Sequence, residues 1–165
     1  ETAALMVTHE SEEAMFMSDN IVVLRDGQVQ QTGRPVNLYC QPNSAFVAEF
    51  FGEVNQLEGI VANGTIQTVL GVFEAPEDCV EGQQVQIVIR YEALFIEPDS
   101  TGANAEVMEA RLLGRASLIH LSVPTGTNAL HLHARVPGLN SLQSGSKVRI
   151  TVDPSQAFVF PSPAM

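Results

Sequence analysis

Closely spaced turn signals divide the chain after residue 53 into short apolar segments, and this spacing constrains the fold more than any other feature. Residues 84–90 alternate strictly, with Val85, Ile87 and Ile89 as the apolar positions, which predicts a half-buried strand. Asn63-Gly64 predicts a two-residue hairpin turn. Further apolar segments lie between turns at 57–62, 65–70, 72–74, 94–96, 107–113, 117–123, 129–136 and 147–152. We therefore expect a small barrel or sandwich of strands.

Residues 1–52 have a different pattern, in which short strands and helices alternate. The apolar run of residues 3–8 predicts a buried strand, and the glutamates that follow it are typical of the first turn of a helix. Asp26-Gly27 predicts a hairpin between residues 21–24 and 28–31. Pro35 and Ser44 are suited to begin two further short helices. The boundary between the two parts is expected near residues 52–54.

Charge and composition exclude several classes of function. The chain has 165 residues and a formal net charge of −11, and residues 53–165 carry twelve acidic against six basic side chains. Such a surface repels phosphate backbones, so we expect no nucleic-acid partner. Apolar residues make up 45% of the chain, which is enough for a packed core, yet no apolar run is long enough to span a bilayer. The two cysteines, Cys40 and Cys79, suit a reducing cytoplasm.

The string from residue 7 onward resembles the C-terminal end of the nucleotide-binding domain of ABC transporters. The matching residues, in order, are Val7-Thr8-His9-Glu10, Glu13-Ala14, Asp19, Ile21, Val23, Gly27, Val29, Gly33, Pro35, Leu38-Tyr39, Pro42, Phe46-Val47-Ala48 and Phe50-Phe51-Gly52. By this resemblance, His9 is the switch histidine of the H-loop. Taken alone, a histidine at a strand end is more often a structural residue.

The resemblance continues into the second half of the chain. The segment GQQVQIVIRYEALFIEP is similar to part of the TOBE regulatory domain, which has an OB-like β-barrel fold, and RLLGRASLIHLSV, SGSKVRITVDP and FVFP match its later strands. Arg90 and Glu92 lie at its motif positions, whereas Tyr91 replaces the usual proline. The implied fold class is α+β, mainly β: a remnant of a P-loop ATPase domain over residues 1–52, followed by a TOBE domain over residues 53–163.

The family is a transport ATPase that uses ATP and Mg²⁺. Phosphoryl transfer needs a glycine-rich loop with its lysine, bound Mg²⁺ and a group that positions the attacking water. The sequence contains no G-x-x-x-x-G-K-[ST] string, and its one lysine, Lys147, lies in the β half. We therefore expect that this chain alone neither binds nor hydrolyses ATP.

The resemblance also implies partners and a location. These are a second copy of the chain, permease subunits that hold it at the cytoplasmic face of the membrane, and indirectly a periplasmic binding protein. The apolar run of residues 3–8, if its neighbouring strands are missing, independently favours a homodimer or swapped oligomer. The stretch FFGEVNQLEGIVANGTIQTVLGVFEAP resembles ferric-iron importers more than sugar importers, and polyamine importers share much of it. Ferric iron is the expected cargo.

Two other functions remain open from the residues. His131 and His133 share a strand face, and His120 is expected on a neighbouring strand, so the three imidazoles form a candidate metal site. A partly exposed strand face is the simpler interpretation, because no carboxylate or cysteine falls in register with them. The alternative to a transport subunit is a stand-alone small-ligand or anion sensor built from the β domain alone.

Overall fold

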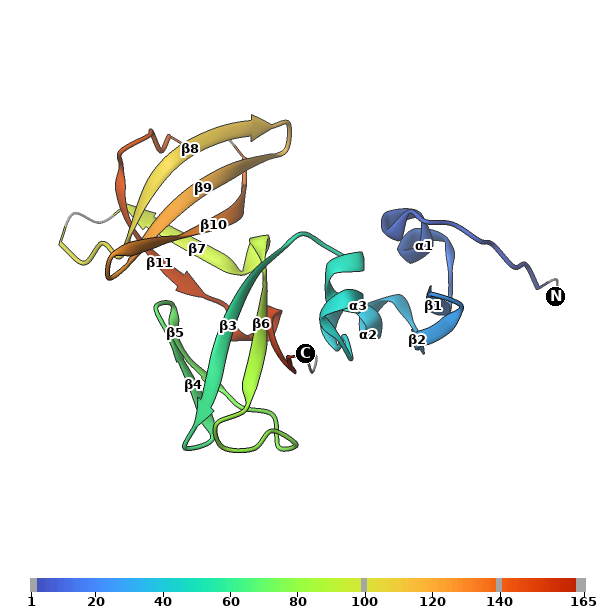
Figure 1. Cartoon of the computed structure of the whole chain (residues 1–165). Helices are drawn as coiled ribbons and strands as arrows, with labels where there is room; N and C mark the ends of the chain where they lie inside the picture. The colour runs from blue at the N-terminus through green and yellow to red at the C-terminus, as the bar shows by residue number, and fades with distance from the viewer. Residues whose placement is uncertain (1–2, 99–100, 139–140, 163–165) are drawn as a thin grey trace. The chain divides into compact units, whose positions relative to one another are not determined.

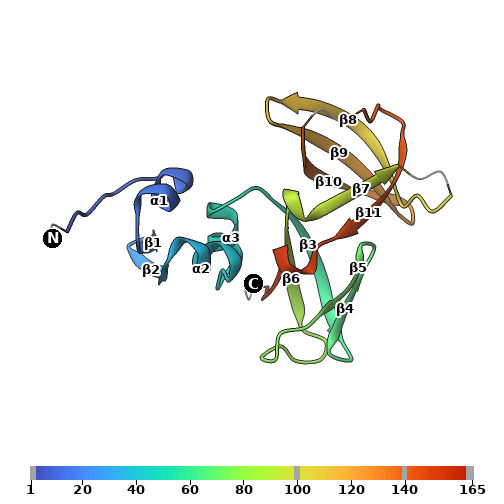
Figure 2. The ribbon, with the colours of Figure 1, turned by 180° about the vertical axis from the view of Figure 1, so that it is seen from behind.

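The computed structural model describes residues 3–98, 101–138 and 141–162. The chain divides into two compact units, Glu1–Glu53 and Val54–Met165. Figures 1 and 2 show the ribbon from opposite sides. Within the described ranges, no helix has the length and apolar character that crossing a membrane requires.

The described residues of the first unit form a β-hairpin and three short helices. In chain order these are α1 (Ser11–Met17), β1 (Ile21–Arg25), β2 (Gln28–Gly33), α2 (Pro35–Cys40) and α3 (Ala45–Phe50). Asp26 and Gly27 both have positive φ, at 52° and 75°, as the two-residue turn between β1 and β2 requires. Pro35 opens α2, and the hydroxyl of Ser44 accepts a hydrogen bond from the Val47 amide at the start of α3. The hairpin and both of these helix starts agree with the prediction.

A small apolar core holds the first unit together. Its buried members come from all three helices and from β1, and they are Ala14, Ile21, Val23, Leu38, Val47 and Phe51. A side-chain amide adds a polar tie, because Gln31 on β2 donates to the carbonyl of Gln41 and accepts from the Asn43 amide, both at 2.9 Å. The loop between α2 and α3 is thereby tied to the hairpin.

The strand that the sequence predicts at residues 3–8 does not form. These residues have no regular structure, and Leu5 and Val7 are 95% and 92% exposed. A strand needs a neighbour to pair its backbone N–H and C=O groups, and no described strand pairs with this segment. An apolar run alone was therefore insufficient evidence for a strand.

The second unit is built from antiparallel strands. Their bounds are β3 (Val54–Ala62), β4 (Thr65–Thr68), β5 (Gly71–Glu74), β6 (Gln84–Arg90), β7 (Leu94–Pro98), β8 (Ala105–Leu113), β9 (Ala116–Thr125), β10 (Asn128–Pro137), β11 (Lys147–Val152) and β12 (Ala157–Pro161). Two single turns of 3₁₀ helix, η1 (Tyr91–Ala93) and η2 (Pro154–Gln156), follow β6 and β11. Among the described residues, the strands of this unit form sheets in the orders β10-β9-β8-β11-β7 and β12-β6-β3-β4-β5.

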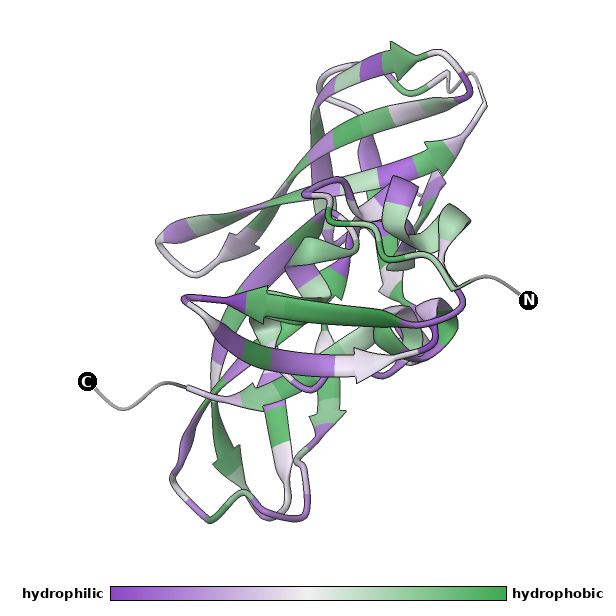
Figure 3. Cartoon of the chain, turned by 90° about the vertical axis from the view of Figure 1, so that its right-hand side faces the viewer, coloured by the Kyte–Doolittle hydropathy of each residue, from purple (hydrophilic) through white to green (hydrophobic). Residues whose placement is uncertain are grey.

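One apolar core fills the space between these two sheets. Along β9, buried residues alternate with partly exposed ones. Figure 3, coloured by hydropathy, shows successive green and purple or white residues along several strands. Fully buried members include Val85, Ile87 and Ile89 of β6 together with Ile119 and Leu121 of β9. Gly59 on β3 allows a close approach, because a Cβ atom there would lie only 2.3 Å from Cγ2 of Ile66. The core therefore packs β4 tightly against β3.

Two asparagine side chains hydrogen-bond to the backbone of a strand as a paired strand would. The amide of Asn55 on β3 donates to the carbonyl of His133 and accepts from its N–H, both at 2.8 Å. Asn104 makes the same pair of bonds with Ile150 of β11, at 3.1 and 2.8 Å. Each amide thus substitutes for a neighbouring strand, and Asn55 joins the two sheets.

Candidate functional site

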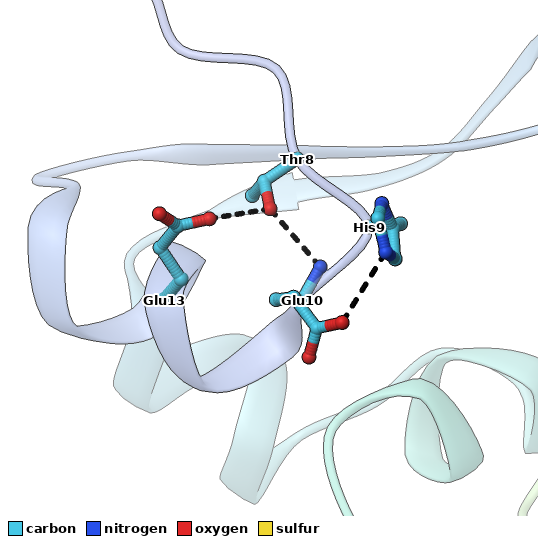
Figure 4. Close-up of polar contacts among 4 residues, drawn as sticks. All are labelled: Thr8, His9, Glu10 and Glu13. Carbon is cyan, nitrogen blue, oxygen red and sulfur yellow. Dashed lines mark hydrogen bonds and ion pairs between the residues drawn. The ribbon is translucent and has the colours of Figure 1, made fainter.

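His9 lies in a polar turn that leads into α1 (Figure 4). The Thr8 hydroxyl donates to Glu13 at 2.6 Å and accepts from the Glu10 amide at 3.1 Å. The His9 imidazole lies 3.2 Å from the Glu10 carboxylate, yet 93% of its side chain is exposed to solvent. The turn therefore fixes the backbone beside His9, while the imidazole itself projects into solvent.

The residues around His9 do not fit ATP and Mg²⁺ by themselves. A nucleotide site needs backbone amides that cradle the phosphates, a lysine and oxygen ligands for the metal ion. Across the described part of the chain, no three His, Cys, Asp or Glu side chains are grouped so that they could hold a metal ion. The exposed His9 supplies one hydrogen-bonding group only, so we derive no catalytic step from it.

The second group of candidate residues begins where β6 ends. Arg90, its last residue, is fully buried, and its guanidinium carbon lies 5.5 Å from the centre of the Phe158 ring. The next residues form η1, which places Tyr91 and Glu92 beside β10. The Glu92 carboxylate lies 3.6 Å from the guanidinium of Arg135 on β10. Arg90 is thus a packing residue of the second unit, whereas Glu92 lies at its surface.

Aromatic rings form a row from η1 across two strands. The Tyr91 ring stacks on His133, with 5.2 Å between the ring centres, and His133 meets His120 edge to face at 4.3 Å. His120 and His133 are direct partners in the pairing of β9 with β10, and Glu109 of β8 is opposite His120. We call Tyr91, Glu92, Glu109, His120, His133 and Arg135 the histidine face. Its members link η1 with three neighbouring strands.

Carboxylates accompany the arginines near this face. The Arg111 guanidinium donates to Glu109 at 2.7 Å. This hydrogen bond, together with the positive charge of Arg111, lowers the pKa of the Glu109 carboxyl, and Glu109 in turn raises the pKa of the Arg111 guanidinium. In the Glu92–Arg135 ion pair, both side chains are only partly exposed to solvent. Because carboxylates offset the arginine charges, the face does not resemble a dedicated anion site.

The three candidate metal-binding histidines are not grouped as a metal site. His120 and His133 are in ring contact, and Glu109 of β8 is opposite His120, so the expectation that no carboxylate falls in register with these histidines was wrong. His131, however, is exposed and pairs with Ser122. The edge-to-face packing of the first two rings joins them to each other and to Tyr91. We therefore describe the pair as part of the histidine face.

Sequence reasoning missed Asn55 and the stacking of Tyr91. A signal for Asn55 was present, because the strand alternation places it on the same side as Leu57 and Val61. A polar residue on a core face usually has a specific hydrogen-bond partner, and here that partner is the backbone of His133. There was no comparable indication for Tyr91, because its ring stacks on His133, which lies on a strand 42 residues later in the chain.

Both units are similar in sequence to known proteins. Residues 87–160 match the TOBE domain. The chain is 34% identical to the sulfate/thiosulfate import ATP-binding protein of Chromobacterium violaceum over 94% of its length. It is 37% identical to the spermidine/putrescine import ATP-binding protein of Pseudomonas fluorescens over 94%, and 33% identical to the Fe(3+) ions import ATP-binding protein of Fusobacterium nucleatum over 96%. The chain is homologous to the C-terminal parts of ABC importer ATP-binding subunits.

The chain spans less than half the length of these importer subunits, covering 45%, 43% and 39% of them respectively. In fold, it is similar to the cytoplasmic molybdate-binding protein ModG, with a TM-score of 0.50 and 15% identity over 66% of this chain and 96% of that one. The expected fold class, mainly β with an OB-like TOBE domain, is confirmed. The three relatives are named for three different cargoes.

Proposed function

We propose that the chain is the C-terminal regulatory portion of the ATP-binding subunit of an ABC import transporter. The observation that carries the proposal is the extent of the similarity, which covers 94 to 96% of the chain and so includes both units. A stand-alone sensor would need only the second unit. The hairpin and helices of the first unit would serve no purpose in it.

In this proposal the two units have separate tasks. The first unit contributes His9, the candidate switch histidine, to an ATP site whose other groups lie outside this chain. The TOBE domain pairs with its counterpart in a homodimer and regulates the subunit. The permease subunits hold the dimer at the cytoplasmic face of the membrane, and a periplasmic binding protein delivers the cargo to them. Ferric iron remains our proposed cargo, on the strength of the segment around residues 50–76.

A chimeric transporter tests this function. The matching C-terminal part of the Pseudomonas fluorescens subunit would be replaced by these 165 residues, and putrescine uptake measured in cells that lack the native subunit. We expect uptake to persist, because the relative supplies the missing nucleotide-binding groups. His9→Ala in the chimera should abolish uptake, whereas His131→Ala, at an exposed position, should leave it unchanged. A folded chimera that binds ATP but supports no uptake would contradict the proposal.

The isolated chain should not bind nucleotide. Titration of the 165-residue chain with Mg-ATP in a calorimeter is expected to give no saturable heat, because His9 alone offers one exposed hydrogen-bonding group. The chimera with an intact ATP site is the positive control. Saturable binding with a micromolar dissociation constant would mean that the chain contains a nucleotide site of its own.

A further inference from the structure

A groove crosses the outer surface of β3 and β6 in the TOBE domain. Its volume is about 1340 Å³, larger than the roughly 300–1,000 Å³ of most small-molecule pockets. The residues that line it are Gln56, Leu57, Glu58, Gly59, Ile60, Ala62, Gln67, Gln84, Gln86 and Ser162. None of the residues that line this groove belongs to the histidine face. Its size suits an extended ligand.

Primary amides dominate the chemistry of the groove. Four of its lining residues are glutamines, contributed by β3, β4 and β6, and the amide of Gln86 donates to that of Gln56 at 2.8 Å. Each amide group offers two donors and one acceptor. A ligand that fits must therefore present both donors and acceptors along its length.

The strand register sets the spacing of these groups. Glu58 is opposite Gln86, and Ile60 is opposite Gln84, in the pairing of β3 with β6. Polar groups on adjacent strands are thus about 4.8 Å apart, and those two residues apart on one strand about 7 Å. Hydroxyl groups around linked pyranose rings are separated by comparable distances. The 57% exposed Ile60 offers an apolar patch for the C–H face of a ring.

Charge decides between the ligand classes that such a surface could take. Strand faces of OB-like barrels bind oligonucleotides or oligosaccharides in other proteins. Glu58 is the one charged residue among those lining the groove, and the whole chain carries a net charge of −11, so a phosphate backbone would be repelled. A polyamine would need several carboxylates, and a single exposed one is weak because solvent screens it.

We propose that this groove binds a neutral oligosaccharide, whose hydroxyls exchange hydrogen bonds with Gln56, Gln84 and Gln86 while Glu58 accepts from a further hydroxyl. The site is open, so the expected dissociation constant is on the order of 1 mM. It would give the TOBE domain a ligand of its own, independently of which cargo the transporter carries.

Side-chain amide NMR signals test the proposal directly. The ¹⁵N-labelled full chain would be titrated separately with maltotriose, cellotriose and raffinose, and with spermidine and sulfate as charged competitors. At least one trisaccharide is expected to shift the side-chain NH₂ signals of Gln56, Gln84 and Gln86 saturably. Gln84→Ala and Gln86→Ala should each weaken that binding about tenfold, while Gln28→Ala, on exposed β2, should not change it.

Two results would overturn the proposal. One is the absence of saturable shifts with all three trisaccharides while the backbone amide spectrum shows a folded TOBE domain. The other is saturable binding of spermidine or sulfate at these amides with the trisaccharides inactive, which would assign the groove to a charged ligand. An unchanged backbone spectrum in the two groove variants shows that a loss of binding is not a loss of fold.

Discussion

At the scale of single residues, two side-chain amides make the hydrogen bonds to strand backbone that a neighbouring strand would normally make. Asn55 reproduces both hydrogen bonds of a paired strand at His133, and Asn104 does so at Ile150. At His133 the amide comes from β3 of the other sheet, and at Ile150 it comes from the residue before β8, a strand that pairs with β11 only at Lys147 and Val148. An asparagine amide suits the position because it can donate and accept at once.

Replacing Asn55 by Asp should destabilise the second unit. The carboxylate keeps an acceptor for the His133 amide but loses the donor to the His133 carbonyl, in a site where Asn55 is only 5% exposed. A buried group left without its partner costs about 1–3 kcal/mol of unfolding free energy. Urea denaturation measures the loss, and Asn128→Asp, at an exposed position of β10, is the matched control. Equal stability of the two variants would contradict this role of Asn55.

Gly59→Ala should also destabilise the second unit. Its new methyl group would lie 2.3 Å from Cγ2 of Ile66, so the Ile66 side chain or one of the two strands must shift. Overpacking of this kind typically costs about 1–3 kcal/mol. A double-mutant cycle with Ile66→Ala identifies the cause, because the cost of Gly59→Ala should fall when the opposing side chain is removed. If that cost is the same in both backgrounds, the clash is not responsible.

At the scale of elements, local signals predicted most of the fold. Asp26-Gly27 and Asn63-Gly64 specify hairpin turns through their positive φ angles, and Ser44 specifies the start of α3 through its side chain. These features depend on neighbours in sequence. The strand expected at residues 3–8 was wrong because a strand depends on a partner elsewhere. For the same reason, the sequence placed His120 near His133 but could not predict their stacking with Tyr91.

The start of η2 gives a prediction about pH. Asp153 accepts hydrogen bonds from the Ser155 hydroxyl at 2.8 Å and the Ser155 amide at 2.9 Å, and these bonds lower the pKa of its carboxyl. Its contribution to stability is therefore complete above the unfolded-state pKa of about 3.9 and is lost as the pH falls through the lower folded value. Asp153→Asn should reduce stability at pH 7, and the difference should shrink in strong acid.

Urea denaturation of the Asp153→Asn variant and the parent protein from neutral to acidic pH checks this result. Glu77→Gln, in the loop between β5 and β6, is the control for removing one negative charge. A stability difference that stays constant down to pH 2 would show that the ionised carboxylate of Asp153 is not the stabilising group.

At the scale of the whole molecule, the chain has two separate apolar cores of unequal size. The core of the first unit has six buried members, whereas that of the second joins strands from both sheets. Small cores bury a smaller fraction of their surface and are less stable. The two units should therefore differ in stability.

Thermal unfolding of the chain should show two transitions. Ile87→Ala removes a fully buried side chain from the second core and should lower the melting temperature of the second unit, at a cost of about 2–5 kcal/mol. Leu38→Ala, in the core of the first unit, should lower the melting temperature of the first unit only. Differential scanning calorimetry separates them. A single transition that both variants shift equally would show that the units unfold as one.

The side-chain bridge at Asn55 also has a consequence for the local dynamics of the barrel. A ladder protects its amide protons cooperatively, but the His133 N–H is protected by one side chain on another sheet. The rate at which the His133 N–H exchanges with deuterium therefore measures how often the Asn55 contact between the two sheets opens. Amide protons within the β9–β10 pairing exchange only through larger unfolding events. A ligand or partner that loosens the contact between the two sheets of the second unit should therefore speed the exchange of this one proton.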